Sequence, residues 1–168
     1  MFIHDNGNLH VLSNTRCGHT SMRKYFGFEE VSRAMHDRWN EWINSTTRRV
    51  LVLRNPIDRW KSAEVFETTG WFIHHKPHNG MDKEFWIWVH RQPYLINIPR
   101  YVNFEIIPFE NLSDYLPMDK GTLVSNSNNV NRHDAKGSSS LREELIQYRY
   151  FREHCKIISP EEWKELTP

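Results

Sequence analysis

The sequence has few cysteines, no long apolar run and almost no net charge, and each of these absences excludes a class of protein. Two cysteines, Cys17 and Cys155, are too few for a disulfide framework and favour a reducing compartment. The apolar runs are far shorter than the roughly 20 residues that cross a bilayer. No secretory hydrophobic segment follows Met1, so the sequence predicts a cytoplasmic protein.

The chain does have the length and the aromatic content of a folded domain. It contains 168 residues, of which 13% are aromatic, and this is too much large apolar surface for a disordered chain. We expect a single domain over residues 1–168. The net charge is +1, but the charges are unevenly distributed. Residues 12–61 contain 10 basic and 5 acidic side chains, and the rest of the chain contains 12 basic and 16 acidic side chains. Such a basic segment is typical of an anion-binding domain, although scattered solvated arginines produce the same count.

Three short segments have the composition of buried strands. Residues 49–54 (RVLVLR) are apolar on both faces, as in a central parallel strand, and residues 9–13 (LHVLS) and 103–108 (NFEIIP) are the other two candidates. Helical segments lie between and after these strands. The alternation predicts an α/β fold in which helices flank a parallel sheet.

The predicted helices have recognisable first residues. Asn55 and Pro56 are types preferred at the N-cap and at the first helical position. Ser140 and Ser159 each precede a glutamate by three residues, which is the spacing of a capping box. Further helices are predicted over residues 21–26 and 82–91, and the polar residues 125–140 are predicted to form a loop.

The turn after the first predicted strand has the composition of an anion-binding loop. Gly18 lets the backbone approach a ligand closely, the amides of a helix start point outward, and Arg16, Thr20 and Ser21 add donors. Cys17 would lie near a helix N-terminus, which lowers the pKa of a thiol. The turn is not a Walker A loop, because the upstream glycine and the lysine of that motif are missing. One glycine with hydroxyl residues also occurs in ordinary strand-to-helix turns.

A second candidate follows the predicted strand at residues 49–54 and reads R-N-P-I-D-R-W-K-S over residues 54–62. Arg54 ends that strand, at the edge of the sheet where ligands bind in open α/β folds. Ser62 lies roughly two turns into the next helix, so both side chains could converge on one phosphate. The alternative interpretation is an ion pair between Arg54 and Asp58, with Ser62 as a small residue in helix packing.

Taken together, the two segments resemble the sulfotransferases that use 3′-phosphoadenylyl sulfate (PAPS). Residues 16–21 (RCGHTS) are similar to the 5′-phosphosulfate loop of that family, and residues 53–63 (LRNPIDRWKSA) match its 3′-phosphate motif at every defining position. Residues 108–112 (PFENL) resemble a later motif of the family, in which a strand ends in E-[DN]-L. The three motifs occur in the same order along this chain as in the family. Arg16 stands where many relatives have lysine, and His19 where they have a small or hydroxyl residue. The resemblance implies a three-layer, P-loop-NTPase-like sulfotransferase fold, closest to the carbohydrate-type members.

The resemblance also implies an activity and a donor site. The expected reaction is transfer of a sulfuryl group from PAPS to a hydroxyl or amine of an acceptor, for which a saccharide is one candidate, with adenosine 3′,5′-bisphosphate (PAP) as product and no metal. Arg16 would be catalytic, at the bridging oxygen. The implied donor-binding residues are Arg16, Cys17, Gly18, His19, Thr20, Ser21, Arg54 and Ser62.

An acceptor hydroxyl needs a base, and histidine has a suitable pKa. His36 is the first candidate, because relatives with a histidine base carry it between the two phosphate motifs. His74, His75 and His78 are the alternatives. These histidines do not predict a metal site, because adjacent histidines point in different directions and no cysteine or acid completes the set.

Two other functions remain open at this point. One is a catalytically silent protein that binds PAP on the same fold. The other is a P-loop-like nucleotide kinase, disfavoured by the missing lysine and by the lack of a convincing Mg²⁺-binding acid after a strand. Nucleic-acid binding is disfavoured, because the basic segment lacks an aromatic–basic pattern and the pI is about 7.9.

Overall fold

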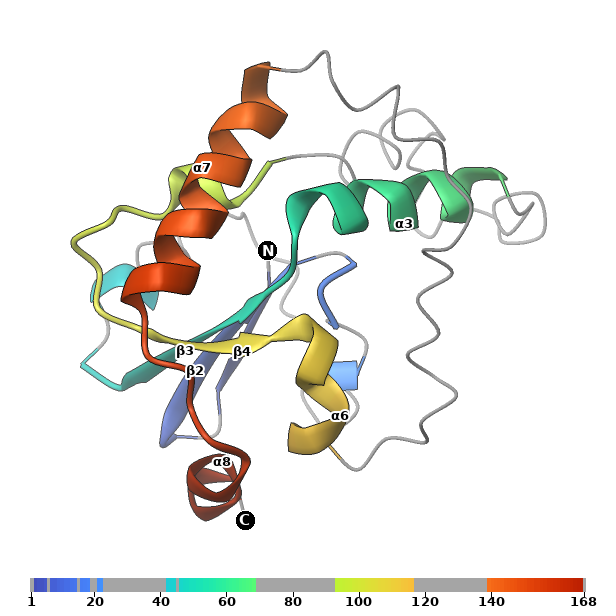
Figure 1. Cartoon of the computed structure of the whole chain (residues 1–168). Helices are drawn as coiled ribbons and strands as arrows, with labels where there is room; N and C mark the ends of the chain where they lie inside the picture. Colours follow the sequence, from blue (N-terminus) through green and yellow to red (C-terminus); the bar gives the residue numbers. More distant parts are fainter. Residues whose placement is uncertain are drawn as a thin grey trace, which may run out of the picture.

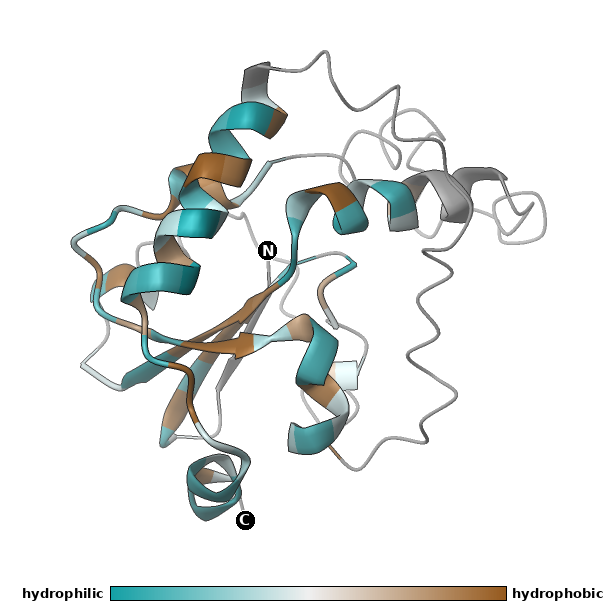
Figure 2. Ribbon diagram, in the orientation of Figure 1, coloured by the Kyte–Doolittle hydropathy of each residue, from teal (hydrophilic) through white to brown (hydrophobic). Residues whose placement is uncertain are grey.

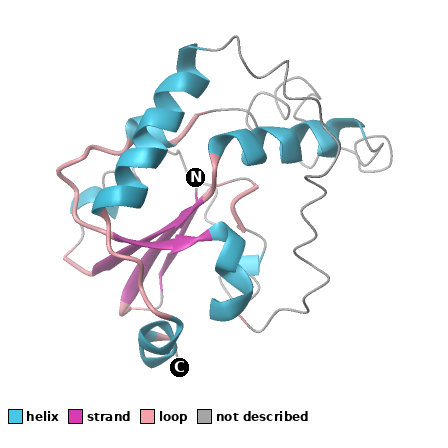
Figure 3. Ribbon diagram, viewed as in Figure 1, coloured by secondary structure: helices cyan, strands magenta, loops and turns pink. Residues whose placement is uncertain are grey.

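The computed structural model describes residues 2–5, 7–14, 16–18, 21–22, 42–44, 46–68, 93–116 and 139–167. The elements are β1 (Phe2–Asp5), β2 (Leu9–Ser13), β3 (Arg48–Leu53), α3 (Pro56–Thr68), η2 (Leu95–Asn97), β4 (Glu105–Pro108), η3 (Phe109–Asn111), α6 (Leu112–Tyr115), α7 (Ser139–His154) and α8 (Pro160–Leu166). Three strands lie in the first part of the chain, α3 and η2 separate them from the fourth strand, and the remaining helices follow it (Figures 1 and 3).

The strands form one sheet in the order β1-β2-β3-β4. β2, β3 and β4 are parallel, with Val11 opposite Val50 and Leu51 opposite Ile106. The predicted strand at residues 9–13 is confirmed; the second begins and ends one residue earlier than predicted, and the third begins two residues later. The three predicted strands form a parallel sheet, as expected, and β1, which was not predicted, pairs antiparallel with β2 at its edge. The α/β class is confirmed.

Both faces of the parallel strands are buried, so the sheet is the middle of three layers. Successive side chains of a strand point to opposite faces. Leu51 and Leu53 pack with residues of η2 and α7, whereas Val50 and Val52 pack with residues of α6 and α8. The helices accordingly lie on both sides of the sheet (Figure 1), and hydrophobic residues concentrate on the strands between them (Figure 2). This double burial explains why β3 is apolar at every position after Arg49.

The helices α3 and α8 begin at the N-cap residues that the sequence predicts. The Oδ1 atom of Asn55 accepts a hydrogen bond from the amide of Ile57 at 2.9 Å, and Pro56 is the first residue of α3, as predicted. Ser159 caps α8 by accepting from the amide of Glu162, but the second half of the predicted capping box is absent because the Glu162 carboxylate pairs with Arg48 and Lys156. α7 begins one residue before the predicted cap Ser140.

Some predicted elements lie outside the described residues. Ser21 and Met22 are helical, and the rest of the helix predicted over residues 21–26 is not described. The same holds for the helix predicted over residues 82–91 and for the polar residues 125–138. Where the chain is described, no helix is both long enough and apolar enough to cross a membrane.

Candidate functional site

The two candidate anion-binding segments lie at the same edge of the sheet. The carboxyl ends of parallel strands meet at one edge, which is where ligands bind in open α/β sheets. Arg16 follows the end of β2, Arg54 follows the end of β3, and Phe109 follows the end of β4. Figure 1 shows α3 and α6 starting at this edge. The parallel register therefore brings together segments that are 38 residues apart in the chain.

Arg54 connects the three segments physically. Its Nη1 donates a hydrogen bond to the backbone carbonyl of Arg16, and its guanidinium carbon lies 4.2 Å from the centre of the Phe109 ring. Only 6% of Arg54 is exposed. Burial lowers the pKa of the Arg54 guanidinium, although an arginine stays charged in proteins. The edge therefore carries a positive charge that is largely removed from water.

The environment of this charge differs from that of Arg59, the other buried arginine among the described residues. Arg59 is fully buried and its Nη2 lies 3.0 Å from Oε2 of Glu144, so its charge is balanced. Within the described ranges, no carboxylate lies at ion-pair distance from Arg54. The alternative in which Arg54 pairs with Asp58 is therefore wrong. Buried charges are usually paired or bound to a ligand, and Arg54 has the environment of a group that receives an anion.

The loop before this edge turns tightly. Arg16 and Gly18 have φ of 62° and 76°, and the amide of Cys17 donates to the carbonyl of Asn14 at 2.9 Å. The carbonyl of Gly18 accepts from the amide of Met22 at 2.9 Å, and Ser21 and Met22 are helical. This is the strand–turn–helix order that the sequence predicts for an anion-binding loop.

Gly18 has a second reason to be glycine, besides close approach of a ligand. A Cβ atom at this position would lie 2.4 Å from Cδ2 of Leu112, the first residue of α6 and fully buried. Both the left-handed backbone and the packing against Leu112 therefore require glycine.

We expect Gly18→Ala to lower the free energy of unfolding by about 2 kcal/mol, because it adds overpacking to the cost of a left-handed residue. Gly7→Ala is the matched control, since Gly7 has φ of 85° and nothing within 4 Å of its Cβ position; its expected cost is about 1 kcal/mol. Urea unfolding of both variants measures the difference. Equal losses, or a difference that persists in a Leu112→Ala background, would contradict the packing explanation.

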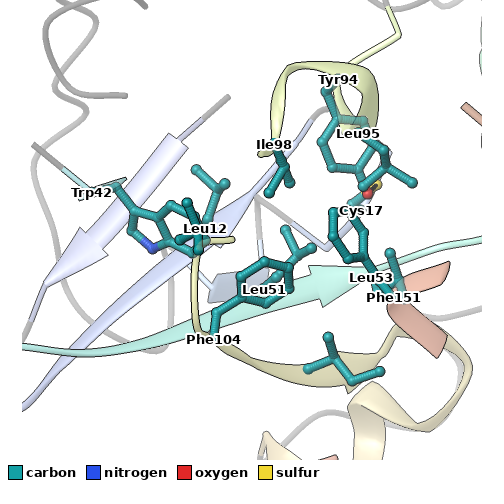
Figure 4. Packing of buried hydrophobic residues seen from close by; sticks show 12 residues of the cluster. Leu12, Cys17, Trp42, Leu51, Leu53, Tyr94, Leu95, Ile98, Phe104 and Phe151 are labelled. Carbon is teal, nitrogen blue, oxygen red and sulfur yellow. Dashed lines mark hydrogen bonds between the residues drawn. The ribbon is translucent and has the colours of Figure 1, made fainter. Parts of the chain in front are cut away.

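The Cys17 side chain faces the core. Cys17 is fully buried, and its Sγ donates to the hydroxyl of Tyr94 at 3.5 Å (Figure 4). Burial raises the pKa of the Cys17 thiol, and the nearby positive charge of Arg59 does not offset this. The expectation of a thiol pKa lowered by a helix N-terminus is therefore wrong. At this position the backbone, and not the thiol, is what a ligand at the edge can contact.

The other predicted site residues divide into two groups. Ser21 and Ser62 are half-buried, Ser21 at the helical turn after the loop and Ser62 on the second turn of α3. Ser62 is about 9 Å along the helix axis from Pro56, and no hydrogen bond joins it to Arg54 among the described contacts. The second group lies outside the described residues: His19, Thr20, His36, His74, His75 and His78.

A cleft of about 720 Å³ lies at the opposite edge, where β3 and β4 begin. Arg48, Glu105 and Lys156 line it, and Arg48 and Lys156 both pair with Glu105 and Glu162. Hydrogen bonds from Arg48 and then Lys156 lower the pKa of Glu162 to about 2. These ion pairs join β3, β4 and α8. Arg49 and Arg100 also line the cleft, and they bond neutral groups, the carbonyl of Ile43 and the side chain of Gln147. The described residues contain no group of three metal-ligating side chains.

Three residues of this region were not predicted from the sequence. Phe109 supplies the ring under Arg54, Tyr94 contacts Cys17, and Glu144 balances Arg59. Phe109 follows a predicted strand and so carried a positional signal. Tyr94 and Glu144 carried none, because their partners are 77 and 85 residues away.

Comparison with protein-family models, with curated proteins and with solved structures finds no match for this chain. The residues at the carboxyl edge of the sheet therefore carry the functional argument.

Proposed function

We propose that this protein is a sulfotransferase that binds PAPS at the carboxyl edge of β2 and β3 and transfers its sulfuryl group to an acceptor hydroxyl or amine. The observation that carries the proposal is Arg54, a nearly buried cation with no described carboxylate partner that also bonds the backbone of Arg16 in the first loop. A donor with phosphates at two positions needs two anion-binding segments held at a fixed separation. Both segments resemble the sulfotransferase motifs, and this resemblance is the reason for proposing PAPS as the donor.

The residues suit the two halves of such a donor. Nη1 of Arg54 bonds the Arg16 carbonyl, and Nε and Nη2 remain to donate to the 3′-phosphate, with Ser62 as a second donor. The loop amides and Ser21, at a helix start, suit the 5′-phosphate. Arg16 and, outside the described residues, Thr20 and His19 complete this set.

Sulfuryl transfer is an in-line displacement in which negative charge develops on the leaving phosphate oxygen. Catalysis of this kind depends mainly on positioning and on electrostatic stabilisation. In the proposal, Arg16 stabilises that charge, and His36 accepts the acceptor's proton, with His74, His75 and His78 as alternatives. No metal takes part. A three-layer, P-loop-NTPase-like sulfotransferase fold is part of the proposal, and so are a cytoplasmic location and a saccharide as one candidate acceptor.

Thermal unfolding with three nucleotides tests the donor assignment. At a concentration of about 100 times its Kd, a ligand that binds only the folded protein raises Tm by roughly 5–10 °C for a domain of this size. We expect this shift with PAP and a much smaller one with ATP or adenylyl sulfate, because neither carries a 3′-phosphate.

The other functions give different results in the same series. An equal response to ATP, or none to PAP, contradicts the donor assignment, and Mg²⁺-dependent ATP turnover would indicate a nucleotide kinase instead. Selective PAP binding without transfer from radiolabelled PAPS to a broad acceptor panel would indicate a catalytically silent PAP-binding protein.

A further inference from the structure

A buried ion pair joins α3 to α7 behind the proposed donor site. Arg59 and Glu144 are both fully buried, and Nη2 of Arg59 lies 3.0 Å from Oε2 of Glu144. The other carboxylate oxygen, Oε1, accepts a hydrogen bond from the backbone amide of Tyr94 at 3.0 Å. The Arg59 guanidinium carbon also lies 5.5 Å from the centre of the Tyr94 ring. Glu144 therefore fixes a helix and a loop at the same time.

Tyr94 extends this contact to the donor-binding segments. Its hydroxyl accepts from Sγ of Cys17 at 3.5 Å and lies 3.5 Å from the carbonyl oxygen of Val52, to which it donates. Cys17 lies between Arg16 and Gly18 in the first loop, and Val52 precedes Arg54 by two residues. Figure 4 shows the Tyr94 hydroxyl beside the Cys17 sulfur. One side chain thus contacts both segments from inside the core.

We propose that Glu144, Arg59 and Tyr94 form a positioning link that sets the separation of the two phosphate-binding segments. The inference rests on the proposed function, and it adds that α7 controls selection of the bisphosphate. None of the three side chains needs to touch the donor. They act through the loop at residues 16–18 and through α3, which carries Ser62 and begins two residues after Arg54.

The physical reason is that a buried network that joins several elements has few alternative arrangements. Both oxygens of Glu144 have partners, Arg59 and the Tyr94 amide. Removal of its charge weakens the contact between α7 and α3, and either helix can then shift. A ligand that spans both segments responds to their separation. A ligand that contacts only one segment does not.

The test compares affinities for two nucleotides in matched variants. Glu144→Gln keeps the shape and removes the charge, Tyr94→Phe removes only the hydroxyl, and Glu143→Gln makes the same change one residue away at an exposed position. We expect the first two variants to weaken PAP binding by on the order of tenfold, a coupling typical between linked sites. Binding of adenosine 5′-monophosphate, which lacks the 3′-phosphate, and all binding by Glu143→Gln should be unchanged.

A second readout needs no nucleotide. In a Cys155→Ser background, alkylation of Cys17 should be faster in Glu144→Gln and Tyr94→Phe than in Glu143→Gln, by more than the loss of global stability explains. If Glu144→Gln does not fold, Tyr94→Phe decides both readouts.

The outcomes separate the two proposals. Failure of the wild-type protein to select PAP overturns the proposed function and this inference with it. Two results with a wild type that selects PAP would overturn the positioning link and leave the proposed function standing. In the first, both variants bind PAP as tightly as the wild type does. In the second, their affinities for PAP and for adenosine 5′-monophosphate fall by the same factor.

Discussion

Replacing Arg59 by methionine lowers the free energy of unfolding by about 3–5 kcal/mol, because removing one partner of a buried ion pair leaves the other charge uncompensated. Glu144 is fully buried, so water cannot replace the lost guanidinium. The Tyr94 amide remains a partner of Oε1, but a single neutral donor does not balance a buried carboxylate. Urea unfolding at neutral pH measures the loss.

Two further variants identify the cause of that loss. The double variant Arg59→Met with Glu144→Gln should recover part of it, because a neutral acceptor for the Tyr94 amide remains and no charge is left buried. Arg149→Met, at an exposed position of α7, should change stability by less than about 0.5 kcal/mol. A loss below about 1 kcal/mol in Arg59→Met, the size typical of an exposed pair, would contradict the importance of burial.

Local features of the sequence predicted the elements that local physics determines. β2 and β3 are apolar on both faces because helices cover both sides of the sheet, and this pattern is visible without knowledge of the partners. The N-caps Asn55 and Ser159 satisfy amides within three residues of themselves. Such contacts need no tertiary information.

Contacts between distant segments could not be predicted in this way. The antiparallel pairing of β1 depends on which strand is its neighbour, and a short strand does not specify that. Asp58 is the nearest carboxylate to Arg54 in sequence, which made an ion pair a reasonable alternative. Arg54 precedes α3, however, and its side chain follows the strand edge to the carbonyl of Arg16. The contact between Arg54 and Arg16 follows from the parallel pairing of β2 and β3, and it could not be predicted from the residue types around Arg54.

Arg54→Ala should weaken PAP binding by on the order of 100-fold, the loss expected when charge-assisted hydrogen bonds to a phosphate disappear. Arg54→Lys should weaken it by about tenfold, because lysine keeps the charge but cannot donate as a fork. Adenylyl sulfate affinity should change much less, since that nucleotide has no 3′-phosphate. Isothermal titration with each nucleotide measures these effects.

Arg49→Ala is the matched control for Arg54→Ala. Arg49 belongs to the same strand but lies at its opposite end, where it donates to the carbonyl of Ile43 and lines the cleft at the other edge. We expect unchanged PAP affinity in this variant. An equal loss of PAP and adenylyl sulfate binding in Arg54→Ala would mean that Arg54 serves mainly to hold the Arg16 carbonyl. A loss confined to PAP would instead identify Arg54 as the group that distinguishes a 3′-phosphorylated donor from other adenine nucleotides, because only that ligand needs the two guanidinium nitrogens that the Arg16 carbonyl leaves available.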